Sequence, residues 1–211
     1  MTTLKTRAAA AAMVALTGVA AAAPVFQGRL ADGTASSTCT ASGANKCTSF
    51  YDSNLNITIL NNWNIGRGYW SATAAAGSAQ ALAKSAGFAA TGLTGWILPT
   101  GDGDSAAGGL NQFLSIWNDV GGTLAGLQGQ FDGVQTDDYW SGTVFASVGS
   151  GLAWRFRTLN GDQQFTDQFR SLYAVAVRPG DVAASVPEPQ TLALALLALG
   201  ATVVARKRRP A

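Results

Sequence analysis

Two aspartates stand one residue apart in a glycine-rich segment, Asp102-Gly103-Asp104-Ser105. Carboxylates at this spacing can both face a hard cation such as calcium, and the glycine permits the tight backbone path that a cation-binding loop needs. The segment lacks the glutamate and the longer spacing of an EF-hand loop. The alternative is therefore a solvated turn in which Asp104 or Ser105 caps the following helix. Asp102 and Asp104 are the candidate metal ligands of this chain.

Three arginines, Arg155, Arg157 and Arg170, form a second candidate site. Arg155 and Arg157 alternate along one predicted strand, so their side chains share a face of it. Arg170 follows the next predicted strand and comes near them if that strand pairs back across the hairpin. The sequence thus predicts a local positive surface for ligand binding.

The chain of 211 residues contains no histidine. Ser-His-Asp and Cys-His nucleophile activation are therefore impossible, as are zinc and iron sites with histidine ligands. A glycosidase would need two carboxyl groups roughly 5–10 Å apart in a cleft, and no motif in the sequence indicates such a pair. We expect a protein that is not an enzyme and that has no cofactor beyond a calcium ion.

Both ends of the chain carry features of export. Lys5 and Arg7 precede an apolar core, residues 8–19, and an alanine run, which together predict a signal peptide over residues 1–22. A disordered alanine-rich tail is the alternative, but it leaves the basic start unexplained. Near the other end, the apolar residues 191–205 would reach about 22 Å as a helix, which makes them a marginal span of a bilayer core roughly 30 Å thick. An ordinary single-pass anchor is the alternative there.

Removing both signals changes the charge of the chain from +2 to −3, because residues 24–186 contain eight Lys or Arg and eleven Asp. A mildly acidic domain argues against a nucleic-acid partner. Export also places the two cysteines, Cys39 and Cys47, in an oxidising compartment, and two cysteines are too few for a four-ligand zinc site. We expect them to form a disulfide that closes a small loop.

Between the signals the sequence predicts a loose N-terminal arm, residues 23–49, and one α+β domain, residues 50–182. Two helices are expected, over residues 71–86, where Gly87 ends the helix, and over about 109–120. An antiparallel, strand-rich C-terminal third follows, with Asn160-Gly161 as a type I′ hairpin signal. The predicted strands cover residues 50–52, 56–60, 139–146, 151–159, 163–169 and 172–178.

Bulky and charged residues of these strands have expected structural roles. Trp96, Trp140 and Trp154 are expected in the core, because a large ring on a strand usually packs inward. Arg178, which lies at a strand end, is expected to pair with a half-buried carboxylate.

Four ordered motifs of the domain resemble the Lcl C-terminal domain family of bacterial surface and secreted proteins. They are Trp96-Ile97-Leu98-Pro99-Thr100, Tyr139-Trp140-Ser141-Gly142-Thr143, Ala153-Trp154-Arg155-Phe156 and the closing strand that ends in Val177-Arg178. Ile97 departs from the family pattern, which usually has Arg there, and residues 101–109 are a Gly/Asp insertion. The resemblance implies a small C-type-lectin-like fold and attachment to sulfated or acidic glycans. For such ligands Arg155, Arg157 and Arg170 are the candidate binding residues.

The C-terminal end, residues 183–211, resembles the PEP-CTERM sorting signal of Gram-negative bacteria. The residues that carry the resemblance are Pro187, Glu188, Pro189, Arg206, Lys207, Arg208 and Arg209, on either side of the short apolar helix. The resemblance implies processing by exosortase after cleavage by signal peptidase, with a transient stay in the inner membrane. It also implies a place at the cell surface or in the exopolysaccharide matrix.

These features favour a non-catalytic exported protein that binds polysaccharide or mediates attachment. A structural matrix or surface protein without a discrete ligand is the alternative, and a carboxylate-dependent polysaccharide hydrolase is a third. Only a ligand test separates the first two.

Overall fold

Short apolar strands build two five-stranded sheets in this computed structural model, which describes residues 25–102, 111–145 and 151–183. The first sheet is antiparallel throughout. Its strands, in spatial order, are β10 (Val177–Pro179), β4 (Ile57–Leu60), β3 (Ser49–Asp52), β1 (Phe26–Arg29) and β2 (Ala35–Ser36).

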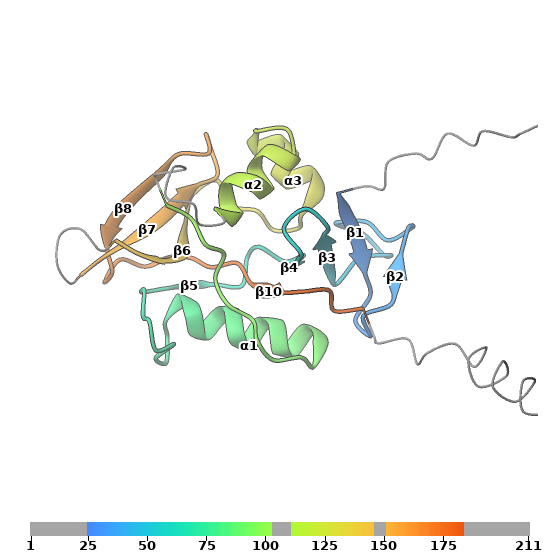
Figure 1. Cartoon of the computed structure of the whole chain (residues 1–211), viewed down its shortest axis with the longest axis horizontal. Coiled ribbons are helices and arrows are strands. Elements are labelled where there is room, and N and C mark those ends of the chain that lie inside the picture. Colours follow the sequence, from blue (N-terminus) through green and yellow to red (C-terminus); the bar gives the residue numbers. More distant parts are fainter. Residues whose placement is uncertain (1–24, 103–110, 146–150, 184–211) are drawn as a thin grey trace, which may run out of the picture.

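The second sheet lies beside the first, and strands of the predicted strand-rich C-terminal third form most of it (Figure 1). Its strands, in spatial order, are β5 (Arg67–Gly68), β9 (Leu172–Tyr173), β6 (Asp138–Val144), β7 (Leu152–Arg157) and β8 (Gln163–Asp167). Only the β6–β9 pair is parallel. The described residues thus form a mixed α+β domain with three helices and two sheets.

Residues 174–177 join the two sheets and show how the core is divided. Sequence alone predicts one strand over residues 172–178, but β9 ends at Tyr173 in the second sheet and β10 begins at Val177 in the first. The three residues between the strands and Val177, the first residue of β10, are fully buried, and their side chains point alternately to the two sides. Val175 and Val177 pack into one apolar cluster, and Ala174 and Ala176 pack into the other.

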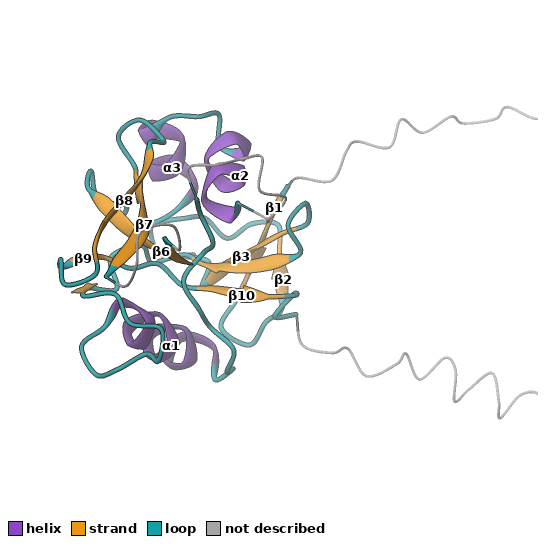
Figure 2. Cartoon of the chain, turned by 60° about the vertical axis from the view of Figure 1, so that its left-hand side comes forward, coloured by secondary structure: helices purple, strands orange, loops and turns teal. Residues whose placement is uncertain are grey.

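The two clusters lie on opposite faces of the strands. Helices α2 (Gln112–Asp119) and α3 (Leu124–Gln130) cover one face, and α1 (Ala79–Thr91) covers the other (Figures 1 and 2). On the α2/α3 side, Trp63 stacks on Phe131 with ring centroids 4.9 Å apart, and Phe113 stacks on Phe156 at 4.7 Å. The cluster on the α1 side combines large rings, Trp70, Trp96 and Trp140, with small residues such as Ala79 and Ala83 of the helix.

Helix α1 is displaced from the predicted range, residues 71–86. It begins after Ser78, whose hydroxyl accepts a hydrogen bond from the Ala81 N–H, whereas Ala74 has a positive φ of 54° that no helix contains. Gly87 does not end the helix but lies buried within it. A Cβ there would lie 2.1 Å from the Trp96 ring, so glycine is required for this close approach.

The second predicted helix is confirmed as α2, which ends at Asp119, one residue before the predicted end. Phe113, Ile116 and Trp117 form its buried face. The sequence analysis missed α3, a seven-residue helix with Thr123 as its N-cap. Its single buried residue, Leu127, gives no periodic apolar pattern over so short a length.

The prediction of a loose N-terminal arm is wrong for the described residues after 24. Strand β1 is an inner strand of the first sheet and pairs with both β2 and β3. The predicted disulfide joins Cys39 to Cys47, and Cys47 is buried in the core. A Cβ on Gly28 would lie 2.5 Å from the Cys39 sulfur, so β1 passes directly over the disulfide. The composition of this segment, which is rich in Ser, Thr, Ala and Gly, did not reveal these long-range pairings.

The β7–β8 hairpin is confirmed, but its predicted type I′ turn is wrong. The loop between the strands has five residues, 158–162, and the Arg157 N–H donates to the Asp162 carbonyl at 2.8 Å. Gly161 has a positive φ of 73°, whereas Asn160 does not, and a type I′ turn requires both.

Candidate ligand-binding faces

Arg155 and Arg157 project from the same face of β7, as their alternation predicts. Both bind one carboxylate, that of Asp138 on the neighbouring strand β6. The Arg155 Nη1 atom lies 2.7 Å from Asp138 Oδ1, and Arg157 Nε donates to the same oxygen at 3.0 Å. Arg155 also donates to the Gln164 side chain at 2.8 Å. The hydrogen bond to Asp138 raises the pKa of the Arg157 guanidinium further.

Arg170 lies apart from this pair along the hairpin. It belongs to the exposed turn after β8, where its N–H donates to the Asp167 carbonyl, and Asp167 pairs with Leu152 at the start of β7. Arg157 is at the other end of β7. Within the described ranges, the Arg170 side chain forms no hydrogen bond or ion pair.

Of the two candidate metal ligands, only Asp102 belongs to the described residues; Asp104 lies outside them. The Asn111 Nδ2 atom donates to the Asp102 carbonyl oxygen at 2.8 Å and approaches its carboxylate Oδ1 at 3.5 Å. The N-cap of α2 is Asn111, which accepts from the Leu114 N–H, so the predicted cap at Asp104 or Ser105 does not serve this helix. Among the residues with described positions, no group of three potential metal ligands occurs.

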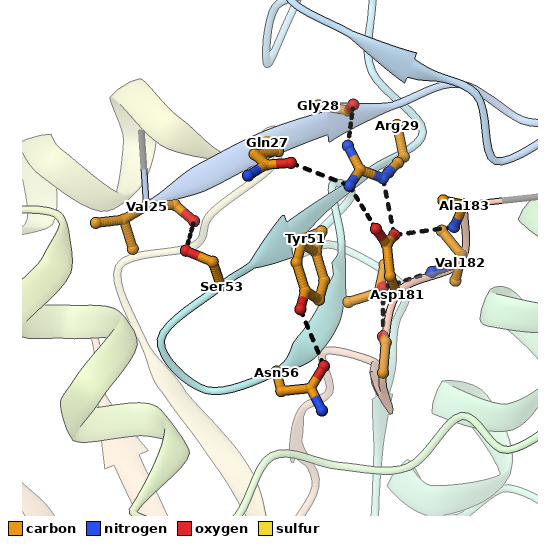
Figure 3. A network of polar contacts seen from close by, with 12 residues as sticks. Val25, Gln27, Gly28, Arg29, Tyr51, Ser53, Asn56, Asp181, Val182 and Ala183 are labelled. Carbon is orange, nitrogen blue, oxygen red and sulfur yellow. Dashed lines mark hydrogen bonds and ion pairs between the residues drawn. The ribbon is translucent and has the colours of Figure 1, made fainter. Parts of the chain in front are cut away.

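A buried ion pair joins the start of the domain to its end (Figure 3). Arg29 on β1 is 3% exposed and donates two hydrogen bonds to the Asp181 carboxylate, at 2.8 Å and 2.6 Å. Its guanidinium also lies 5.4 Å from the centroid of the Tyr51 ring. Burial alone would raise the pKa of Asp181, but the hydrogen bonds from Arg29 and the Ala183 N–H outweigh it and lower that pKa. Arg29 and Asp181 thus form a structural clamp on the first sheet.

The prediction that Arg178 pairs with a carboxylate is wrong among the described residues. Arg178 Nε donates to the Thr94 carbonyl at 2.9 Å, and Nη1 donates to the Pro179 carbonyl. Its role is structural, as predicted, but its acceptors are backbone oxygens.

The sequence analysis missed an aromatic cluster on the second sheet, Phe145, Trp154 and Phe165, which we call the aromatic platform. Phe145 stacks on Phe165 with centroids 4.0 Å apart, and Trp154 meets both rings edge-on at 5.3 Å and 5.8 Å. Trp96 and Trp140 are buried as predicted, whereas Trp154 is only half-buried and Phe165 is 47% exposed. The signal available in the sequence was the pair of aromatic residues at matching positions of the predicted hairpin strands.

Polar side chains flank the aromatic platform on the same side of the hairpin. Gln163 precedes Phe165 by two residues on β8, so both side chains project from one face. Its Oε1 atom accepts from Asn111 Nδ2 at 3.2 Å, and Asn111 also binds Asp102. An amide, a carboxylate and aromatic rings therefore lie along one surface.

The export signals predicted at both ends lie outside the described residues. No helix of residues 25–102, 111–145 and 151–183 is long and apolar enough to cross a membrane. The predicted apolar helix, residues 191–205, is not part of these ranges.

Comparison with known protein families matches residues 185–209 to the PEP-CTERM protein-sorting motif. The chain is therefore an exported protein with a PEP-CTERM signal, which implies processing by exosortase and sorting to the cell surface. Comparison with curated proteins finds no match.

Proposed function

We propose that this protein is a non-catalytic component of the cell surface or exopolysaccharide matrix, and that its domain binds polysaccharide. The observation that carries the proposal is the combination of a PEP-CTERM signal with an exposed aromatic platform on the second sheet. Exposed apolar patches on a folded domain typically mark interaction sites. At a cell surface the abundant partners of such a patch are glycans.

A C-type-lectin-like fold related to the Lcl C-terminal domain is part of this proposal. Its motif residues supply the centre of the domain: Trp96 and Trp140 pack in one apolar cluster, and Tyr139 and Phe156 pack in the other. The motifs thus mark residues that hold the two sheets and their helices together. This supports a common fold, with ligand contacts made by the side chains that the core leaves exposed.

A non-catalytic role agrees with how the carboxylates are used. Asp138 and Asp181 are held by arginines, and Asp132 pairs with Lys46. Asp52 is fully buried, and its Oδ1 accepts the Asn54 and Leu55 N–H groups of a tight turn. Each of these four carboxylates is engaged in an ion pair or in a tight turn, rather than free to act as a general acid beside a bound sugar.

The test is a binding screen of the exported protein, purified with its disulfide intact, against dissolved neutral and acidic polysaccharides. Electrophoresis through native gels that contain each polysaccharide measures binding as retarded migration, with calcium and with a chelator. We expect saturable retardation by at least one polysaccharide and no release of reducing ends. Absence of retardation in every gel would contradict the proposal and favour the structural matrix protein, and release of reducing ends would favour the hydrolase.

A further inference from the structure

The aromatic platform continues a face of the sheet that α2 covers only in part. Trp154 and Phe156 alternate with the arginines of β7, so they share one face. Phe156 is buried beneath Phe113 and Trp117 of α2. Two residues earlier, the ring neighbours of Trp154 are Phe145 and Phe165, and Phe165 remains 47% exposed. The core thus extends into an accessible aromatic surface.

The shape of this surface suits a sugar ring. A stacked pair of phenyl rings with an indole at their edge presents flat, apolar area of fixed geometry, since each ring is held by the other two. The C–H groups on one face of a pyranose ring can lie on such an area. A ligand that covered these rings would be stabilised by the hydrophobic effect, because apolar ring surface would be removed from water.

The polar groups beside the platform suit hydroxyl groups. Gln163 uses its Oε1 atom to accept from Asn111, and its Nε2 donor has no partner among the described residues. Among the residues that the structure describes, the Asp102 carboxylate receives only the 3.5 Å contact from Asn111. An unpaired amide donor and a carboxylate acceptor are complementary to neighbouring hydroxyls, which both accept and donate hydrogen bonds.

The charges beside the platform disfavour an acidic ligand. Asp102 contacts Asn111, the hydrogen-bond partner of Gln163, and Asp167 follows Phe165 by two residues on the same face of β8. The arginines of the hairpin, Arg155 and Arg157, project from the opposite face and bind Asp138. An anionic sugar stacked on the rings would therefore meet Asp167 rather than Arg155 or Arg157, at a cost from like-charge repulsion. Arg170 belongs to the turn beyond Asp167.

We infer that Phe145, Trp154 and Phe165, with Gln163 beside them, bind a polysaccharide built of uncharged sugars. This inference rests on the proposed function, because it names the ligand class and the site of the same binding activity. It differs from the expectation of an acidic glycan held by Arg155, Arg157 and Arg170.

The experiment compares variants of the exported protein in native gels that contain galactomannan or dextran, as neutral probes, or alginate, as an acidic probe. Trp154→Ala and Phe165→Ala remove platform rings. Phe88→Ala is the matched control, because Phe88 is 54% exposed on α1, on the other side of the strands. Arg157→Ala and Arg170→Ala test the arginines, and circular dichroism with thermal unfolding verifies that every variant is folded.

We expect a neutral probe to retard the protein, and each platform variant to weaken its affinity about tenfold or more, because aromatic anchors dominate binding energy at such sites. Phe88→Ala and the arginine variants are expected to leave it unchanged. Retardation by alginate alone, lost in high salt and in the arginine variants, would overturn the inference while supporting the proposed function. Neutral binding that survives in folded Trp154→Ala and Phe165→Ala would also overturn it, and absence of binding to every probe would overturn both.

Discussion

In the first sheet, Arg29 meets an aspartate that is distant along the chain, whereas in the second sheet Arg155 and Arg157 meet an aspartate of the neighbouring strand. Arg29 is almost fully buried, and its partner Asp181 lies 152 residues away along the chain. Arg155 and Arg157 share Asp138 on adjacent strands, and the Arg157 side chain is 38% exposed. The Arg29–Asp181 pair holds the two ends of the domain together. The pairs with Asp138 join β6 and β7, which are already neighbouring strands.

The aromatic residues of the two sheets differ in the same way. Phe50 of the first sheet packs edge-on against Phe131 inside the core, whereas Phe145 and Phe165 of the second sheet stack at the surface. The contrast teaches that the first sheet is built for stability, and that the outer strands of the second sheet carry residues available to a ligand. Four variants test this division.

The largest effect is expected for Arg29→Ala. It removes a buried cation and both of its hydrogen bonds to Asp181, and breaking a buried ion pair typically costs about 3 kcal/mol. Urea-induced unfolding of the exported protein measures the loss of free energy of unfolding. A loss below about 1 kcal/mol would show that the clamp is not a major constraint.

The Arg29→Ala variant should also change how the free energy of unfolding depends on pH. Because the native pKa of Asp181 is lowered, its stabilisation is present at neutral pH and is lost as the pH falls through and below its ordinary value of 3.8. Arg29→Ala should therefore show a weaker loss of stability on acidification than the native protein. Equal acid sensitivity in the two proteins would contradict this origin of the pKa shift.

The second effect is expected for the double variant Cys39→Ser/Cys47→Ser. Loss of a disulfide across a sequence separation of 8 should cost roughly 2.5 kcal/mol, because the unfolded chain regains loop entropy. Thermal unfolding measures it. At temperatures where the variant is folded, polysaccharide binding should be unchanged; loss of binding there would show that the two sheets are not functionally separate.

A much smaller loss is expected for Arg157→Ala. Its ion pair with Asp138 is partly exposed, and Asp138 keeps Arg155 as a partner, so the free energy of unfolding should fall by less than about 1 kcal/mol. Urea-induced unfolding beside Arg29→Ala provides the comparison. Equal losses in the two variants would remove the distinction between the sheets.

The Asp52→Asn substitution tests whether the buried carboxylate of Asp52 in the first sheet lowers stability when it is ionised. Burial raises the pKa of Asp52, and nearby Asp119 adds repulsion, so ionisation of Asp52 lowers stability as the pH rises above its ordinary value of 3.8. An amide keeps the Oδ1 acceptor that the turn uses and carries no charge. The Asp52→Asn substitution should therefore raise the melting temperature at pH 7 and raise it less at pH 4. A fall at pH 7 would indicate that the carboxylate is required.

Much of the fold could be predicted from local pattern. The strands near residues 50 and 57, helix α2 and the β7–β8 hairpin follow from alternating or helical spacing of apolar residues. What could not be predicted depends on distant partners. Strand β1, Phe-Gln-Gly-Arg, has no alternating apolar pattern and is held by β3, and Gly87 lies within a helix where Trp96 packs against it. No local propensity records such contacts.

The candidate sites show the same limit. Alternation placed Arg155 and Arg157 on one face of β7, but it could not show that Asp138 of β6 lies between them. Trp154 was expected in the core with Trp96 and Trp140, but the structure shows that α2 packs on Phe156 and leaves Trp154 half-buried.

The sequence by itself determined that the protein is exported and which kinds of catalytic site it cannot form. The sorting motif at residues 185–209 is read as a linear signal, and the missing histidine excludes whole classes of catalysis whatever the fold. Only the tertiary structure decided which side chains are available. Alternation assigns a residue to a face of a strand, but burial depends on what covers that face, and the covering helices come from distant parts of the chain.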